Sequence, residues 1–213
     1  IIGPVFKNKM GQVIYGAINY AKSGWGISLE GKRVNYFSVR TRPQEELNNG
    51  LIHFVPAMSR QNSYRLLSFY QPATQEIGEM AFQGELRVSP LPDWTLLFHQ
   101  SLINDLNAAK LYRESLCESS IVKYNKYTLI SGVQLREYNQ EVYEGKPNAP
   151  IVRSITPYVD YIKQLNQKNS IRINGEYMIS RQAEGSWMNL LLEYSIAPKW
   201  IFTLSDMYNV KPV

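Results

Sequence analysis

Residues 170–180, Ser-Ile-Arg-Ile-Asn-Gly-Glu-Tyr-Met-Ile-Ser, alternate between apolar and polar side chains, and this alternation decides the fold class. The odd positions carry Ile171, Ile173, Tyr177 and Ile179, and the even positions carry Arg172, Asn174, Glu176 and Ser180. Side chains along a strand point to opposite faces in turn, whereas a helix would scatter these residues around its circumference. The segment therefore predicts a β-strand with one apolar face and one polar face.

The same period of two recurs along the chain. Clear alternation occupies residues 78–89, 154–161 and 187–196, and weaker alternation occupies 12–21, 26–36, 94–102, 110–122, 127–138 and 200–208. This predicts about ten strands of roughly ten residues, whereas ordinary strands are most often about 5–6 residues long. Strands that cross a membrane need about 9–11 residues, so strand length favours a membrane barrel.

The predicted connections alternate between short and long. Short ones lie at residues 22–24, 90–93, 124–126, 166–169 and 197–199, and longer, more polar ones lie at 40–77, 104–109, 139–153 and 181–186. An antiparallel up-and-down meander with tight turns at one end and larger loops at the other has this layout. We therefore predict an all-β fold, a transmembrane β-barrel or partial barrel.

Aromatic side chains mark the predicted strand ends. These residues are Trp25, Trp94, Tyr127, Trp187 and Trp200. Membrane barrels carry aromatic girdles where the strands meet the interface, so this set is predicted to form the girdle. Tryptophan also caps strands in soluble sandwiches, which is the competing interpretation.

Charged residues gather on the polar side of the predicted strands. The set is Glu79, Glu85, Arg87, Arg136, Asp160, Arg172, Glu176 and Glu193. In a barrel this side would line the lumen, and acids and arginines would pair across neighbouring strands. Two of the carboxylates could instead serve a glycosidase. We favour the lumen interpretation and predict no catalytic residues.

Composition excludes several classes of protein. Only 19% of the 213 residues are charged while 12% are aromatic, which is unlike a disordered chain. No apolar run reaches 18 residues, so no transmembrane helix is predicted. The net charge of +5 is mild and the basic residues are dispersed, so nucleic acid is not an expected partner.

Candidate chemistry is sparse. His53 and His99 lack neighbours at metal-ligand spacing, and Cys117 has neither a resolving cysteine nor an adjacent base. No phosphate-binding loop and no hydrolase motif occurs. We therefore expect no metal, no cofactor and no enzymatic activity.

The connection over residues 40–77 is the longest, and loops of this length are often functional. Its aromatic and arginine side chains suit a recognition surface or a fold that plugs the lumen. The predicted recognition residues are Arg60, Tyr64, Arg65, Phe69 and Tyr70. A loop that packs on its own barrel for stability is the alternative.

Several stretches carry a resemblance to a known family. They are residues 54–64, 70–75, 78–83, 197–202 and 205–209. In order and spacing they resemble an uncharacterised family of large outer-membrane β-barrel proteins from Bacteroidota-type bacteria, described only as a domain of unknown function. The resemblance implies an exported barrel protein of the bacterial outer membrane, of which residues 1–213 form a segment incomplete at both ends, with 40–77 as its long external loop.

These observations give three expectations. The first is a porin-like transport barrel with a water-filled lumen, in contact with outer-membrane lipid. The second is a binding or scaffold barrel whose 40–77 loop contacts a protein partner of the envelope. The third is a soluble β-sandwich that binds glycans through exposed aromatic residues.

Overall fold

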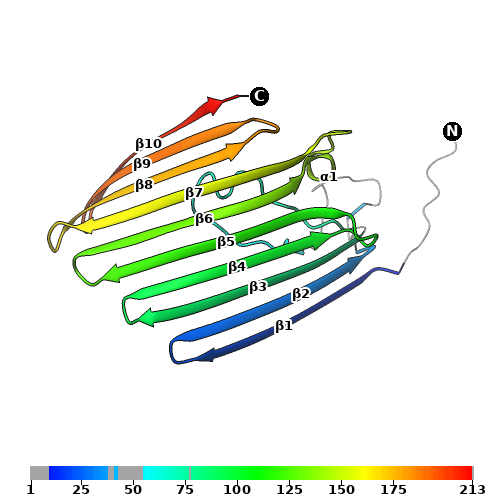
Figure 1. The fold of residues 1–213 in the computed structure, drawn as a ribbon, viewed down its shortest axis with the longest axis horizontal. Coiled ribbons are helices and arrows are strands. Elements are labelled where there is room, and N and C mark those ends of the chain that lie inside the picture. Colours follow the sequence, from blue (N-terminus) through cyan, green and yellow to red (C-terminus); the bar gives the residue numbers. More distant parts are fainter. Residues whose placement is uncertain (1–9, 38–40, 43–54, 77, 213) are drawn as a thin grey trace.

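A computed structural model describes residues 10–37, 41–42, 55–76 and 78–212, and it contains one antiparallel sheet of ten strands (Figure 1). The first five strands are β1 (Gln12–Lys22), β2 (Trp25–Asn35), β3 (Gly78–Leu91), β4 (Trp94–Asn104) and β5 (Lys110–Lys123). The others are β6 (Tyr127–Asn139), β7 (Ile151–Gln164), β8 (Asn169–Ser180), β9 (Ser186–Ile196) and β10 (Trp200–Lys211). Each strand pairs with its neighbours in the chain, which confirms the predicted all-β meander.

The strand lengths and the alternation of short and long connections also agree with the sequence-based prediction. The strands contain 11 to 14 residues. All short turns lie at one end of the sheet, on the left in Figure 1. Gly24 adopts a positive φ of 86° between β1 and β2, a left-handed conformation that costs glycine least.

The connection between β6 and β7 contains a short helix that the sequence pattern did not predict. Helix α1 spans Gln140–Glu144. The Asn139 side chain accepts a hydrogen bond of 3.1 Å from the Val142 amide and so caps the first turn. Gly145 ends the helix with a φ of 65°.

The sheet is open rather than closed. β1 and β10 form its two edges, and the described strands contain no pairing between them (Figure 1). Of the two predicted forms, a barrel or a partial barrel, the described residues do not form a closed barrel. The described strands form one curved, open sheet with β1 and β10 as its two edge strands.

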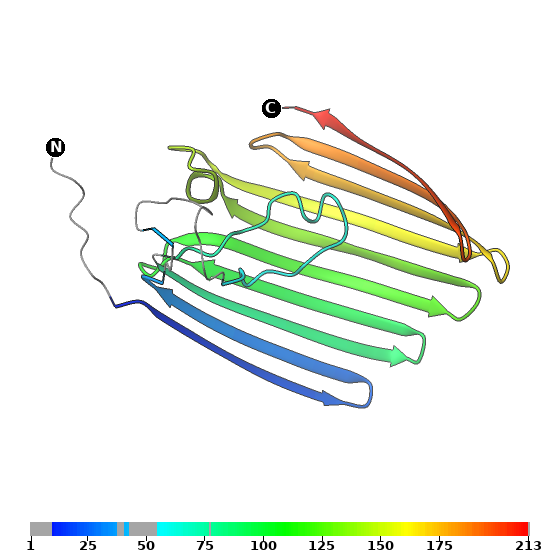
Figure 2. The same ribbon diagram turned by 180° about the vertical axis from the view of Figure 1, so that it is seen from behind.

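Residues 55–76 lie against one face of this sheet, as Figure 2 shows. We call the covered face the inner face and the opposite one the outer face. An apolar cluster fills part of the space between segment and sheet, and it includes Leu66 and Tyr70 from the segment and Tyr112 and Met178 from the sheet. The segment therefore forms a second layer over the sheet.

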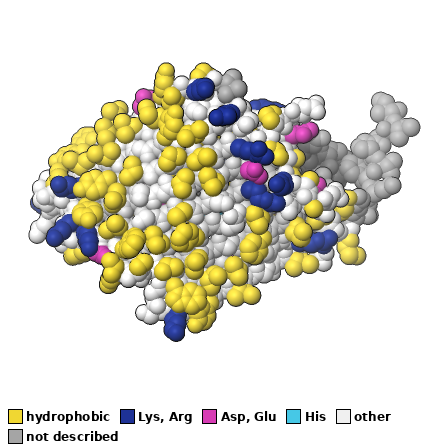
Figure 3. Space-filling model, viewed as in Figure 1, with side chains coloured by type: hydrophobic (Ala, Val, Ile, Leu, Met, Phe, Trp, Pro, Cys, Tyr) yellow, Lys and Arg dark blue, Asp and Glu magenta, His cyan; other side chains and the backbone are white. Residues whose placement is uncertain are grey.

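The two faces have the opposite polarity to that of a soluble protein. On β8 the outer side chain of Ile173 is 41% exposed, whereas the inner side chain of Glu176 is 4% exposed. Apolar side chains spread across the outer face in Figure 3. Buried polar side chains include Glu79, Glu114 and Gln134. Within the described residues no helix has the length and apolarity to cross a membrane.

Candidate functional site

The inner face carries all the charged residues that the sequence assigned to a lumen. Strand alternation brings them to one side, because they occupy the positions between the apolar outer residues. Within the set, Glu85 accepts a hydrogen bond of 2.8 Å from Arg87, and Arg172 lies opposite Glu193 in the register of β8 and β9. The full set is Glu79, Glu85, Arg87, Arg136, Asp160, Arg172, Glu176 and Glu193.

A cross-strand ion pair lies on this face near the turn between β7 and β8. The Arg172 guanidinium donates from Nε to Asp160 Oδ1 at 2.9 Å and from Nη2 to Asp160 Oδ2 at 2.7 Å. Such two-point pairing fixes both the distance and the orientation of the two groups. This pair belongs to the acid–arginine ladder that the sequence pattern predicts.

Lys32 of β2 ties both ends of residues 55–76 to the sheet. Its ammonium group donates to the Pro56 carbonyl at 2.7 Å and to Thr74 Oγ1 at 2.8 Å. It also pairs with Glu79 at 2.9 Å, and both side chains are buried. Glu79 in turn accepts from the Gln75 amide at 2.8 Å. Removing either charge would leave the other buried and unpaired.

Glu176 of β8 holds the middle of the segment. Its carboxylate accepts from the backbone amides of Arg65 at 3.1 Å and Leu66 at 2.6 Å. Asn189 of β9 donates to the same carboxylate at 3.0 Å. Hydrogen bonds to an ionised acceptor are stronger than neutral ones, so Glu176 is a specific anchor.

A buried polar network meets the segment at the Leu67 carbonyl. Arg136 donates to that carbonyl and, at 2.6 Å, to Gln134 Oε1. Gln134 donates to Glu114 at 2.9 Å, and Tyr112 donates to Glu114 at 2.6 Å. The network therefore connects β5 and β6 to the segment through groups that are shielded from solvent.

The predicted recognition residues Arg60 and Tyr64 contact side chains on the inner face of the sheet. Arg60 lies between Glu85, at 3.4 Å, and Glu118, at 3.7 Å. The Tyr64 hydroxyl donates to Asp160 at 3.2 Å. Burial and the neighbouring Asp160 carboxylate raise the pKa of Tyr64 above its usual range, so the phenol keeps the proton that it donates.

Of the remaining predicted recognition residues, Phe69 and Tyr70 pack against the sheet and Arg65 faces solvent. Phe69 packs against Trp187 with ring centroids 5.7 Å apart, and Tyr70 packs against Tyr138 at 5.2 Å. Arg65 has an exposed side chain. The structure thus brings Arg60, Tyr64, Phe69 and Tyr70 to the inner face and leaves Arg65 accessible.

Gly132 of β6 makes room for one of these contacts. A Cβ at this position would lie 2.8 Å from Tyr158 Cζ and 2.6 Å from the Cys117 carbonyl oxygen. Because glycine leaves this space free, Tyr158 extends across β6 and donates to Glu118 at 2.5 Å. The Tyr64 ring packs at a tilt against Tyr158 with centroids 4.8 Å apart, so Gly132 indirectly determines where the segment sits on the sheet.

The predicted girdle residues fall into two groups. Trp25, Trp94, Tyr127 and Trp200 begin β2, β4, β6 and β10, so they share the short-turn end of the sheet. Trp187 differs, because it lies at the opposite end and packs on the inner face in the apolar cluster. Its position could have been expected, since it shares parity with the polar Asn189 rather than with Met188.

The residues considered for metal or redox chemistry lie apart. Within the described ranges no group of three His, Cys, Asp or Glu side chains could hold a metal ion. His99 is buried on the inner face and Cys117 is exposed. His53, together with 40, 43–54 and 77 of the predicted loop, lies outside the described residues. The arrangement therefore serves to hold a peptide segment, residues 55–76, against the polar inner face of the sheet through charged side chains.

The candidate set predicted from sequence did not include several of these anchors. Lys32, Glu114 and Gln134 hold the segment or its network. The alternation places Lys32 on the charged face, but neither it nor Glu114 and Gln134 belong to the predicted candidate set. Each shares parity with the inner residues of its strand, and that parity was the available signal. Lys32 and Gln134 contact the segment across 42 and 67 residues of sequence, so the pattern alone gave no reason to choose them.

The comparisons with known proteins give one match. A family model described as "Family of unknown function (DUF6029)" matches residues 4–97 and 98–212. No curated protein matches, and no solved structure matches. The prediction of an uncharacterised family is therefore confirmed, while its outer-membrane location stays a prediction.

Proposed function

We propose that this chain, which belongs to the family of unknown function DUF6029, forms wall of a bacterial outer-membrane β-barrel and holds residues 55–76 in the lumen as a plug. The role of such a barrel is non-enzymatic. It would gate a porin-like passage or act as a scaffold in the outer membrane. Its immediate partner would be lipid.

The single observation that carries the proposal is the polarity of the two faces. The outer face exposes Phe82, Phe98, Leu190 and Leu192, while the inner face buries Glu79 and Glu114 completely. Exposed apolar surface of this extent is costly in water. In a membrane barrel the same arrangement is favourable, because lipid covers the outer face and the polar face points inward.

Strand length and aromatic placement support the same proposal. Strands of 11 to 14 residues reach or exceed the roughly 9–11 residues that a tilted spanning strand needs. Trp25 and Trp200 are exposed at the short-turn end. Their amphipathic rings suit a membrane interface.

Residues 55–76 support a plugged rather than an open lumen. The segment is anchored by Lys32, Glu176 and Arg136, which belong to three different strands. Leu66 and Leu67 of the segment are fully buried against the sheet. An open aqueous pore would leave these wall groups hydrated, whereas here the chain itself satisfies them.

The alternative function, partner or glycan binding through the 40–77 connection, has one observation in its favour. Gln61, Ser63 and Arg65 are exposed on the segment, whereas Asn62 and Tyr64 between them are partly buried. Replacing these three residues by alanine tests it, because the anchors stay in place. Loss of a pull-down with envelope components, without loss of stability, would favour this alternative.

Membrane integration is the direct test of the proposal. The purified chain is refolded into lipid vesicles, which are then washed with urea and high salt. We expect the folded chain to remain with the lipid and to need detergent when lipid is absent. A folded, monodisperse protein in detergent-free buffer would sink the proposal.

Conductance tests the plug separately. In planar bilayers we expect low conductance from the unaltered chain and larger, discrete openings from the Glu176→Gln variant, which weakens the middle anchor. The matched control is Asp93→Asn at a short turn, which removes the same charge away from residues 55–76 and should leave conductance unchanged. Equal conductance from all three would exclude residues 55–76 as a plug.

A further inference from the structure

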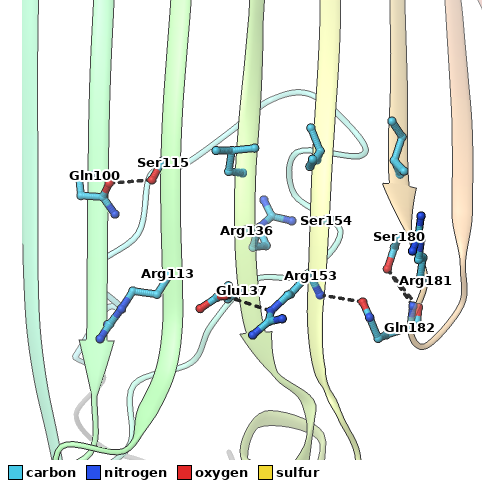
Figure 4. A pocket seen from close by; sticks show the side chains of 13 residues that line it. Gln100, Arg113, Ser115, Arg136, Glu137, Arg153, Ser154, Ser180, Arg181 and Gln182 are labelled. Atoms are coloured by element: carbon cyan, nitrogen blue, oxygen red, sulfur yellow. Dashed lines mark hydrogen bonds and ion pairs between the residues drawn. The ribbon is translucent and has the colours of Figure 1, made fainter.

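A row of charged residues crosses the outer face near the long connections. Arg113 of β5 lies opposite Glu137 of β6, and Glu137 lies opposite Arg153 of β7. Arg181 follows Ser180 directly, and Ser180 lies opposite Ser154. Figure 4 shows the labelled side chains of Arg113, Glu137 and Arg153 side by side, with Arg181 beyond them. Directly opposed residues are about 4.5–5.5 Å apart, so the row is compact.

An apolar row adjoins the charged one. This row lies two residues along each strand from the charged row, toward the middle of the sheet. In it Leu135 lies opposite Ile155, and Ile155 lies opposite Ile179. The two rows line one hollow of about 670 Å³. The hollow is therefore charged on the side of the long connections and apolar on the side of the sheet centre.

A second hollow continues from the first. It measures about 500 Å³ and is lined by apolar side chains that include Leu29, Phe82, Phe98 and Val133. Gln100, Ser115 and Leu135 line both hollows, so the two are contiguous. Together they form a path that runs from guanidinium groups onto apolar surface.

We propose that this path binds a membrane lipid by its phosphate group, with the phosphate among Arg113, Arg153 and Arg181 and an acyl chain along the second hollow. The inference rests on the proposed function, since the lipid reaches the outer face only if that face is in a membrane.

The charges of the row suit a phosphate. Three guanidinium groups and the Glu137 carboxylate leave a net charge of +2, and a phosphate monoester carries about −1.5 to −2 at neutral pH. Arginine pairs with phosphate through parallel N–H donors. Glu137 accepts from Arg153 at 3.1 Å, which holds that side chain over the hollow.

Arg113 is held in place in a similar way. Its Nη2 donates to Asn104 Oδ1 at 2.7 Å, and its Nη1 donates to the Ile103 carbonyl at 3.2 Å. A side chain that is already fixed loses less conformational entropy when it binds a ligand. The charged row is thus partly organised before any ligand arrives.

The surroundings favour a lipid over free phosphate. A free phosphate would gain nothing from Leu135, Ile155 and Ile179 or from the second hollow, whereas an acyl chain buries that surface. The opposite end of the sheet differs, because its outer positions carry Trp25, Trp94 and Trp200. That end also carries Lys22, Lys123 and Lys163 on the outer face, so what distinguishes the long-connection end is its row of three arginines next to an apolar hollow.

Native mass spectrometry of the full chain in detergent micelles tests the inference. Phosphatidic acid is titrated against phosphatidylcholine, and the bound lipid is counted. We expect the unaltered chain to prefer phosphatidic acid, and the Arg113→Gln/Arg153→Gln/Arg181→Gln variant to bind it at least tenfold more weakly. The matched control removes the same charge at the short turns, with Lys22→Gln/Lys168→Gln/Lys199→Gln, and should keep the preference.

The outcomes separate the two proposals. If the triple arginine variant inserts into vesicles but binds phosphatidic acid as well as the unaltered chain does, the lipid site is wrong while the barrel proposal stands. If inorganic phosphate at equal concentration displaces the lipid, the hollow is a free-phosphate site and the lipid assignment is overturned. If the unaltered chain fails to insert, the proposed function itself fails.

Discussion

The two faces of β8 differ by one residue step and have opposite relations to their surroundings. Ile173 and Ile179 point to the outer face and are exposed, whereas Asn174 and Glu176 point to the inner face and are buried. In a soluble protein the apolar side would be the core. Here the polar side is the core, because residues 55–76 supply its partners. The difference teaches that alternation identifies two faces but not which solvent each face meets.

The largest expected effect comes from removing a completely buried charge on the inner face. Glu79→Ala leaves the Lys32 ammonium buried without its carboxylate, and we expect a loss of about 3–5 kcal/mol in the free energy of unfolding. Thermal or urea unfolding in micelles measures it. The control is Asp93→Ala, which removes an exposed partner of Lys123 and should cost about 0–1 kcal/mol. Equal losses would show that burial does not distinguish the two pairs.

The next effect reverses the polarity of the outer face. Ile173→Arg places a charge near the middle of β8, and in a membrane we expect a cost of about 2–4 kcal/mol. The folded fraction recovered in lipid vesicles checks this. Thr203→Arg, at an exposed inner position of β10, is the matched control and should be tolerated. In a soluble protein Ile173→Arg would be harmless, because the side chain is already exposed.

A smaller effect releases the segment without disturbing the sheet. Glu176→Gln removes the charge that accepts from the Arg65 and Leu66 amides, and we expect a loss of about 1.5–3 kcal/mol. Limited proteolysis should then cut within residues 55–76 faster than in the unaltered chain. Unchanged cleavage there would mean that Glu176 is not an anchor.

The smallest effect removes one hydroxyl from the inner face. Tyr64→Phe loses the hydrogen bond to Asp160 but keeps the ring contact with Tyr158, so we expect about 0.5–1.5 kcal/mol. A shift in the unfolding midpoint measures it. Tyr124→Phe, at an exposed turn, serves as control and should leave the midpoint in place. A larger loss in the control than in Tyr64→Phe would contradict the role of this contact.

The strands and their order were predictable because the period of two depends on local sequence. Which side chains of β10 point to which face was not predictable, because the charged Asp206 shares parity with the apolar Phe202 and Leu204. The register with β9, in which Asp206 lies opposite Leu190, places all three on the outer face. The seat of residues 55–76 was not predictable either. Leu66 meets Glu176 across 110 residues, and no local pattern encodes so distant a contact.

The attachment of residues 55–76 also fixes an order of folding. Every strand pairs with its neighbour in the chain, so hairpins can join the sheet one after another at little cost in loop closure. The segment precedes β3, yet its anchors Glu176 and Trp187 belong to β8 and β9. Its ends can attach to Lys32 of β2 early, but its middle can dock only after those strands have joined. The middle of a stretch that is synthesised early is thus among the last parts of the chain to reach its native contacts.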